Sequence, residues 1–115
     1  GVRVRERKLS EFLRNGIDPY EFVMLSYKLD DPAGKRRAHA VLALAMKRIS
    51  DNGGKILVLD PNDTDFSEVK VANVDKGPFH MTHHGQRVFE PRLLSVSHDG
   101  VFEDSIPRLH EVYAR

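Results

Sequence analysis

The stretch AHAVLALAMKRISDNGGKILVLDPN, residues 38–62, decides how this chain folds. It contains two apolar runs on either side of a Gly53-Gly54 turn, with His39 opening the first run and Asp60 closing the second. Two antiparallel strands joined by that turn would bring His39 and Asp60 to within roughly 5 Å of each other. A carboxylate at that distance fixes the tautomer of an imidazole whose other nitrogen faces a nucleophile.

The segment 38–49 is compatible with two conformations. Its alanine, leucine, methionine, lysine and arginine content favours a helix. One face of that helix would carry Val41, Leu42, Ala45, Met46 and Ile49. As a strand, the same run is apolar enough to be buried on both faces. Only the strand allows His39 to meet Asp60.

The rest of the chain predicts short elements around this segment. We expect an amphipathic helix over residues 9–15, ended by Gly16, and a closing helix over residues 106–113. Strands are predicted over residues 22–29, 55–59 and 66–74, with one or two more within 88–97, broken by Pro91. These elements predict an α+β domain with a mostly antiparallel sheet, a short N-terminal helix and a short C-terminal helix.

Composition limits the classes of function. The 115 residues suit one soluble domain, and the net charge of +1, from 18 basic and 17 acidic residues, gives no push toward nucleic acid or a membrane surface. No apolar run is long enough to span a bilayer, and the absence of cysteine excludes disulfides. The chain begins with Gly1 rather than methionine, which we interpret as a fragment or subunit of a larger protein. The sequence does not indicate a cellular compartment.

One pattern resembles a known family. His39-Ala40-Val41 opening an apolar run, followed by a strand that ends in Asp60-Pro61-Asn62, resembles the second half of papain-like cysteine peptidases over about residues 9–66. The branches it looks most like are bacterial effector or toxin peptidases and bacteriocin-processing peptidases. The resemblance implies the sheet half of a papain-like fold and a protein substrate. It implies that His39 is the catalytic histidine, that Asp60 orients it, and that Asn62 lies close by.

The chain departs from that family in one respect. Papain-like enzymes carry a nucleophilic cysteine at the start of a helix well before the histidine, and this sequence contains no cysteine. One interpretation is a cysteine peptidase or deamidase whose thiol comes from a preceding segment or a second chain. The alternative is a non-catalytic protein-binding module on the same scaffold, using the loop 80–86. Neither requires a cofactor.

Three histidines, His80, His83 and His84, form a second cluster. With His98 or Asp99 they would supply ligands for zinc or another transition metal. Their spacing matches no established ligand pattern, so the sequence by itself predicts no metal. A solvated surface loop, or a flap beside a binding cleft, is the simpler interpretation of these histidines.

A third pattern is Asp63 followed by Glu68-Val69-Lys70. Magnesium-dependent nucleases place two carboxylates on Mg²⁺ and a lysine beside the attacked phosphate in a comparable arrangement, for which Asp60 would be the better spaced acid. The simpler interpretation is a half-exposed strand with Glu68 and Lys70 on its solvent face.

Overall fold

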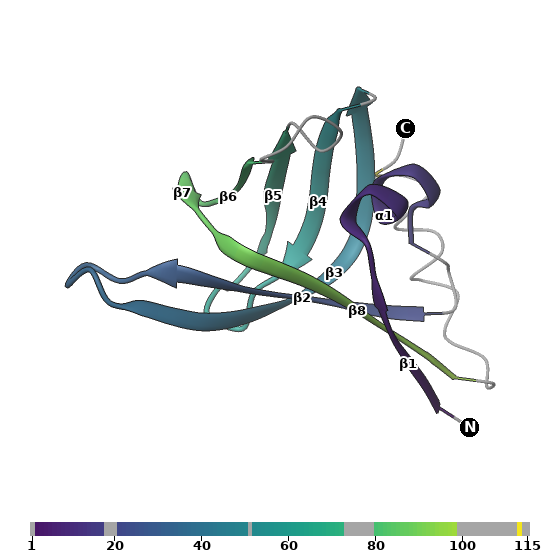
Figure 1. The fold of residues 1–115 in the computed structure, drawn as a ribbon, viewed down its shortest axis with the longest axis horizontal. Coiled ribbons are helices and arrows are strands. Elements are labelled where there is room, and N and C mark those ends of the chain that lie inside the picture. Colours follow the sequence, from purple (N-terminus) through teal and green to yellow (C-terminus); the bar gives the residue numbers. More distant parts are fainter. Residues whose placement is uncertain (1, 18–20, 51, 73–79, 99–112, 114–115) are drawn as a thin grey trace.

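A computed structural model describes residues 2–17, 21–50, 52–72, 80–98 and 113. Its described strands form one antiparallel sheet in the order β1-β8-β2-β3-β4-β5-β6-β7 (Figure 1). The elements are β1 (Val2–Arg7), α1 (Leu9–Asn15), β2 (Glu21–Asp30), β3 (Arg36–Ser50), β4 (Gly53–Leu59), β5 (Phe66–Ala72), β6 (His80–His83), β7 (Gln86–Arg87) and β8 (Phe89–His98).

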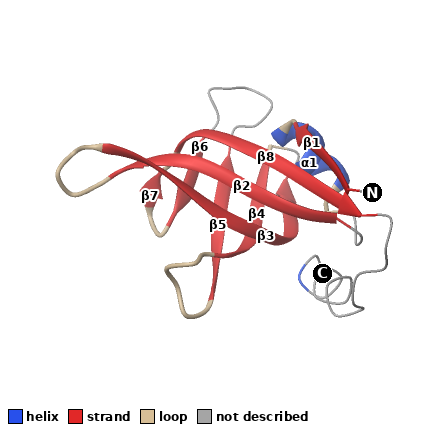
Figure 2. Ribbon diagram, turned by 90° about the horizontal axis from the view of Figure 1, so that it is seen from below, coloured by secondary structure: helices blue, strands red, loops and turns tan. Residues whose placement is uncertain are grey.

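The sheet folds over on itself. Strands β2 to β5 pair in chain order, and β8 returns to pair with both β2 and β1. Figure 2 shows β8 and β2 running across β4, β5 and β6, so the inner faces of the two halves enclose a common core. The β2–β3 hairpin extends beyond the rest of the sheet, and β7 continues almost directly into β8.

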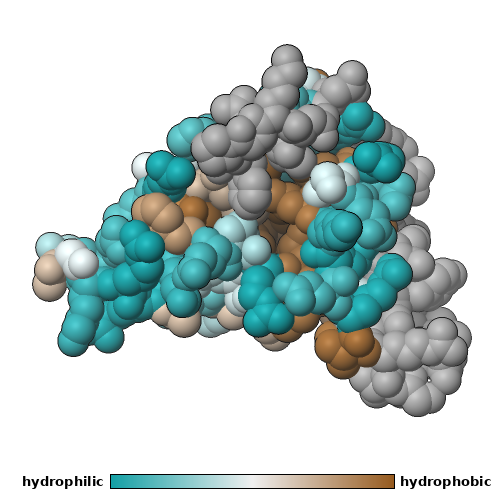
Figure 3. Space-filling view, viewed as in Figure 1, coloured by the Kyte–Doolittle hydropathy of each residue, from teal (hydrophilic) through white to brown (hydrophobic). Residues whose placement is uncertain are grey.

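The core follows the period-two alternation of the strands. Inward positions of β2 and β5 are buried, and Ile56 and Val58 of β4 alternate in the same way. The fully buried large side chains are Phe12, Leu25, Ile56, Met81, Val23, Val41, Val58 and Val69. Figure 3 shows polar side chains over most of one face, with apolar side chains gathered in a hollow near its centre.

Helix α1 has the predicted bounds and packs against the sheet through Phe12 and Leu13. Gly16 ends it with a φ of 73°, which favours glycine, and its N–H donates to the carbonyl oxygen of Phe12. Among the described residues, no helix is long and apolar enough to span a membrane.

Segment 38–49 is strand β3, although its intrinsic propensity favours a helix. It pairs with β2 through residues 36–43 and with β4 through residues 42–50, so two strand ladders take the place of the backbone hydrogen bonds that a helix would form internally. Burial of Val41, Ala43, Ala45 and Met46 adds the packing that overrides propensity. A register shift between Ala43 and Ala45 bends the strand as it passes β4.

The predicted α+β class is wrong. The described chain is dominated by antiparallel sheet and contains the single helix α1, so it is an all-β type of fold. Of the expected C-terminal helix over residues 106–113, only Tyr113 lies within the described residues. Strand β1 was not predicted, because its segment is highly charged; Val2 and Val4 alternate with arginines there, and pairing with β8 makes the segment part of the sheet.

Strand β8 also differs from the prediction, because it runs through Pro91 without a break. The pairing of β8 with β2 shifts register between Ser26 and Lys28, beside the proline. Proline lacks an N–H and is tolerated where the ladder is already interrupted, so this irregularity accommodates Pro91.

Gly54 lies where the backbones of β3 and β4 approach closely. A Cβ atom there would clash with the backbone carbonyl oxygen of Lys47. We expect Gly54→Ala to lower the free energy of unfolding by about 2–3 kcal/mol, because neither backbone can retreat without breaking the ladder. Urea denaturation measures this loss. Gly34→Ala is the control: it meets open space, and its φ of 81° costs only about 1 kcal/mol. Equal losses in the two variants would contradict the close approach.

Candidate functional site

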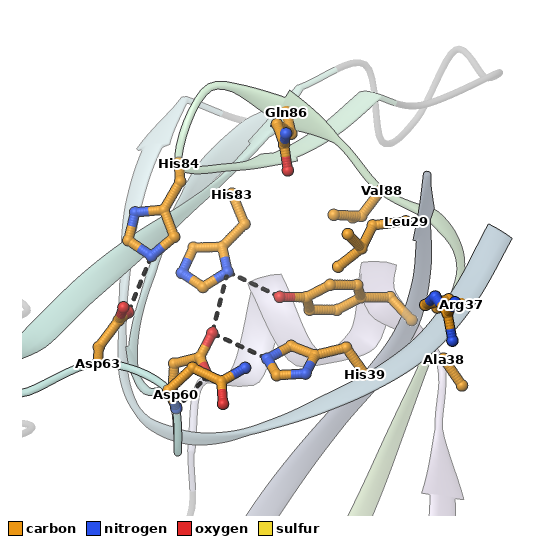
Figure 4. A pocket seen from close by; sticks show the side chains of 12 residues that line it. Leu29, Arg37, Ala38, His39, Asp60, Asp63, His83, His84, Gln86 and Val88 are labelled. Carbon is orange, nitrogen blue, oxygen red and sulfur yellow. Dashed lines mark hydrogen bonds and ion pairs between the residues drawn. The ribbon is translucent and has the colours of Figure 1, made fainter. Parts of the chain in front are cut away.

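A pocket of about 320 Å³ lies between the β2–β3 hairpin, the turn after β4 and the β6–β7 turn. Figure 4 shows polar side chains converging on one wall and Leu29 and Val88 on another. The titratable lining residues are Tyr27, Arg37, His39, Asp60, Asp63, His83 and His84.

His39 and Asp60 meet at the wall of this pocket. His39 lies early in β3, opposite Tyr27 of β2, and Asp60 directly follows the last residue of β4. Their contact joins His39 Nε2 to Asp60 Oδ2 at 2.8 Å. The Asp60 side chain is 6% exposed, whereas that of His39 is 19% exposed. A buried acid therefore holds an imidazole that still reaches the pocket.

The turn after β4 fixes the Asp60 carboxylate. Asp60 Oδ1 accepts a hydrogen bond of 2.9 Å from the backbone N–H of Asn62. The backbone carbonyl oxygen of Asp60 accepts one of 3.0 Å from the backbone N–H of Asp63. Burial disfavours the ionised form, but the Asn62 N–H and the contact with His39 outweigh it and hold the pKa of Asp60 below its ordinary value. Asp60 is a carboxylate at neutral pH.

His83 lies at the centre of a second set of contacts. Its Nδ1 lies 2.7 Å from the Tyr27 hydroxyl and 3.9 Å from Asp60 Oδ2, and its Nε2 lies 2.7 Å from Ser67 Oγ. One assignment gives every hydrogen an acceptor: Tyr27 donates to Nδ1, Nε2–H donates to Ser67, and Ser67 donates to Asp63 at 3.4 Å. In that arrangement Ser67 accepts from His83, so His83 does not activate it as a nucleophile.

Burial explains the charge state of these inner groups. It lowers the pKa of His83, assisted by the neighbouring His84 and opposed by Asp60 and Asp63. Burial also raises the pKa of Tyr27, reinforced by the same two carboxylates. At neutral pH the centre of the site therefore holds a neutral imidazole and a neutral phenol beside carboxylates.

His84 turns toward the pocket because of its backbone. Consecutive strand residues point to opposite faces, but His84 has a φ of 53° and Gly85 a φ of 75°, as in the tight turn of a hairpin. The His83 and His84 rings stack with centroids 4.1 Å apart. His84 Nε2 contacts Asp63 Oδ2 at 2.8 Å.

The structure gathers some of the residues named from the sequence and separates others. His39 and Asp60 lie together, and Asn62 acts on Asp60 through its backbone N–H, while its side chain is exposed. His83 and His84 lie beside Asp60 and Asp63.

His80 does not join the other two histidines. It is exposed at the start of β6, because a strand places residues three apart on opposite faces. His98 ends β8 opposite Val2. Asp99 lies outside the described residues.

The nuclease pattern does not converge either. Glu68 and Lys70 lie on the exposed face of β5, where Glu68 accepts a hydrogen bond of 2.7 Å from the Tyr113 hydroxyl and lies 3.9 Å from Lys55. Asp63 faces the pocket. Two carboxylates on different faces of a sheet cannot share one Mg²⁺ ion.

Tyr27 and Ser67 are the site residues that the sequence did not single out. The alternation of inward and outward residues in their strands could have identified both. Tyr27 continues the inward positions of Val23 and Leu25, and Ser67 lies two residues before the inward Val69. A polar side chain in an inward position needs a partner, and His83 provides it for both.

Comparisons with protein-family models, with curated proteins and with solved structures found no match to this chain.

Proposed function

We propose that this chain contributes the histidine and the orienting acid of a cysteine peptidase or deamidase site that acts on a protein, with the thiol supplied by a preceding segment or a second chain. The contact of 2.8 Å between His39 Nε2 and Asp60 Oδ2 carries the proposal. It combines a buried, ionised acid with a histidine that borders a pocket.

The tautomer follows from that contact. With the Nε2–H donated to Asp60, Nδ1 is the nitrogen that takes the proton of an approaching thiol. The thiolate then attacks the substrate carbonyl carbon, and His39 returns the proton to the leaving nitrogen. Water attacks the resulting thioester in a second step, with His39 again acting as base. Asp60 stabilises the imidazolium that forms in each step.

The pocket suits a small group. A volume of about 320 Å³ is at the lower end of ligand pockets. Leu29 and Val88 offer apolar contact on the wall away from the carboxylates. This supports binding of one side chain of a protein substrate beside His39.

A thiol-directed probe tests the proposal on the full natural protein, together with the chains that copurify with it. We expect covalent labelling of one cysteine, reduced at least about 100-fold in rate by His39→Ala, the scale of general-base catalysis. His80→Ala is the matched control, because His80 is exposed on β6 away from the pocket. Labelling that survives in His39→Ala, or a natural assembly without a reactive cysteine, would falsify the proposal.

A protein-binding module is the second candidate, favoured by an exposed apolar row. The row crosses neighbouring strands through the cross-strand neighbours Met24, Leu42, Leu59 and Phe66. Three of these are more than a third exposed, which is uncommon for adjacent large apolar side chains. Under this function, Met24→Lys releases a copurifying partner that His39→Ala retains, and the thiol probe labels nothing. Retention of the partner by Met24→Lys removes this candidate.

A further inference from the structure

Four side chains at one edge of the pocket form a mixed set of oxygen and nitrogen donors. Asp60 and Asp63 come from the turn after β4, His83 is the last residue of β6, and His84 begins the β6–β7 turn. One potential ligand atom from each lies within 4.8 Å of the other three. Figure 4 shows the His84 ring and the two carboxylates directed into the same space around His83.

His84 reaches this position through a backbone conformation that is unfavourable for a residue other than glycine, with a φ of 53°. A positive φ in a residue other than glycine costs on the order of 1 kcal/mol. Asparagine or glycine would form the same turn more cheaply. With histidine at this position, two consecutive imidazoles lie on one side of the hairpin, and His84 Nε2 lies 2.8 Å from Asp63 Oδ2.

Two imidazoles and two carboxylates match the preference of one class of ion. Zinc and the neighbouring divalent transition metals bind such sets in four-coordinate sites, whereas Mg²⁺ and Ca²⁺ prefer oxygen alone. The required ligand distances are about 2.0–2.2 Å, and the four atoms already lie within 4.8 Å of one another. To bind through Nδ1, His83 would exchange its hydrogen bond from the Tyr27 hydroxyl for the ion and would keep its contact with Ser67 through Nε2.

The neighbouring residues would support such an ion. Ser67 contacts both His83 Nε2 and Asp63 Oδ2, and the Asn62 N–H fixes Asp60. Contacts of this kind orient metal ligands from behind. His39 contacts Asp60 Oδ2, the oxygen that also lies 3.9 Å from His83 Nδ1, and is not one of the four ligands.

We propose that Asp60, Asp63, His83 and His84 bind one divalent transition-metal ion of the zinc class. The site uses neither His39 nor a cysteine, and it shares only Asp60 with the proposed His39–Asp60 pair. The two positive charges of the ion would balance the negative charges of the Asp60 and Asp63 carboxylates.

Titration of the tag-free chain with Zn²⁺, and with Co²⁺ as a spectroscopic probe, tests the site. We expect one ion per chain with a dissociation constant of about 1 μM or below, and cobalt absorption bands typical of four-coordination. Excess Mg²⁺ is expected not to compete. Binding weaker than about 1 mM, or bound cobalt with the spectrum of the hydrated ion, overturns the proposal.

Variants locate the ion. His84→Asn retains a residue suited to a positive φ, and Asp63→Asn retains shape, so both are expected to fold. Each should weaken Zn²⁺ binding at least about 10-fold, since even indirect partners of a metal contribute that much. His80→Ala is the matched control that keeps full affinity, because His80 is exposed at the start of β6. Unchanged affinity in His84→Asn and Asp63→Asn, or equal loss in His80→Ala, would place any bound zinc elsewhere. The zinc titration uses this chain alone, which contains no cysteine, so its outcome is separate from that of the thiol-probe experiment.

Discussion

Asp60→Asn is expected to lower the free energy of unfolding by about 2 kcal/mol at pH 7, the scale of a hydrogen bond to a buried charged group. The amide keeps the oxygen that accepts the Asn62 N–H, so the loss comes from the charge and from the contact with His39. The same substitution should reduce thiol labelling in the full protein and weaken Zn²⁺ binding. Urea denaturation measures the stability effect.

The effect of Asp60→Asn depends on pH with a definite sign. Because folding lowers the pKa of Asp60, the unfolded chain binds more protons near the ordinary value of 3.8, so the carboxylate stabilises the fold above that value. The difference between wild type and variant should be complete above about pH 5 and should shrink as the pH falls below 3.8 through the lowered pKa. Asp63→Asn, at a more exposed carboxylate, is the control and should cost less than about 1 kcal/mol. A difference that stays constant down to pH 2 would contradict the assignment.

Phe12→Ala is expected to be the most destabilising single truncation, at about 3–5 kcal/mol. The ring is completely buried and anchors α1 to the core, with the Arg7 guanidinium 5.3 Å from its centroid. A cavity there would also loosen the hydrogen bond of 3.2 Å from Arg7 to the Gly16 carbonyl. Chemical denaturation monitored by tyrosine fluorescence gives the value.

Phe66→Ala is the matched control, because the same ring on β5 is 52% exposed. Its truncation should cost less than about 1 kcal/mol, since surface substitutions leave no cavity. If Phe12→Ala and Phe66→Ala cost the same, then α1 is not anchored as described.

Local signals predicted much of the sheet. The strands over residues 22–29 and 55–59 and the helix over 9–15 carry clear alternation or a helical face ended by glycine, and the structure has β2, β4 and α1 there. β3 illustrates the limit of propensity, because pairing on both sides decided its conformation. β1 became a strand through its pairing with β8, far along the chain, and no local pattern of residues encodes that partnership.

The candidate site also contains one contact that the sequence predicts and others that depend on the assembled sheet. The approach of His39 to Asp60 followed from one hairpin and was predictable from spacing. The position of His83 over Asp60 depends on β5 and β6 adding to the sheet, and that of His84 on a backbone conformation at one residue. His80 was grouped with them because a strand was not foreseen there. Tyr27 and Ser67 were overlooked because an isolated hydroxyl has no distinctive spacing.

The β3–β4 hairpin has a consequence for the order of assembly. His39 and Asp60 are only 21 residues apart in the chain, so closing this hairpin brings them together on the microsecond scale of such elements. Tyr27 and His83 are 56 residues apart, and β8 must return to pair with β2 and β1 before the sheet is complete. During synthesis from the N-terminus, the pair can therefore form while residues 80–98 are still in the ribosome, and the remainder of the pocket is built around it.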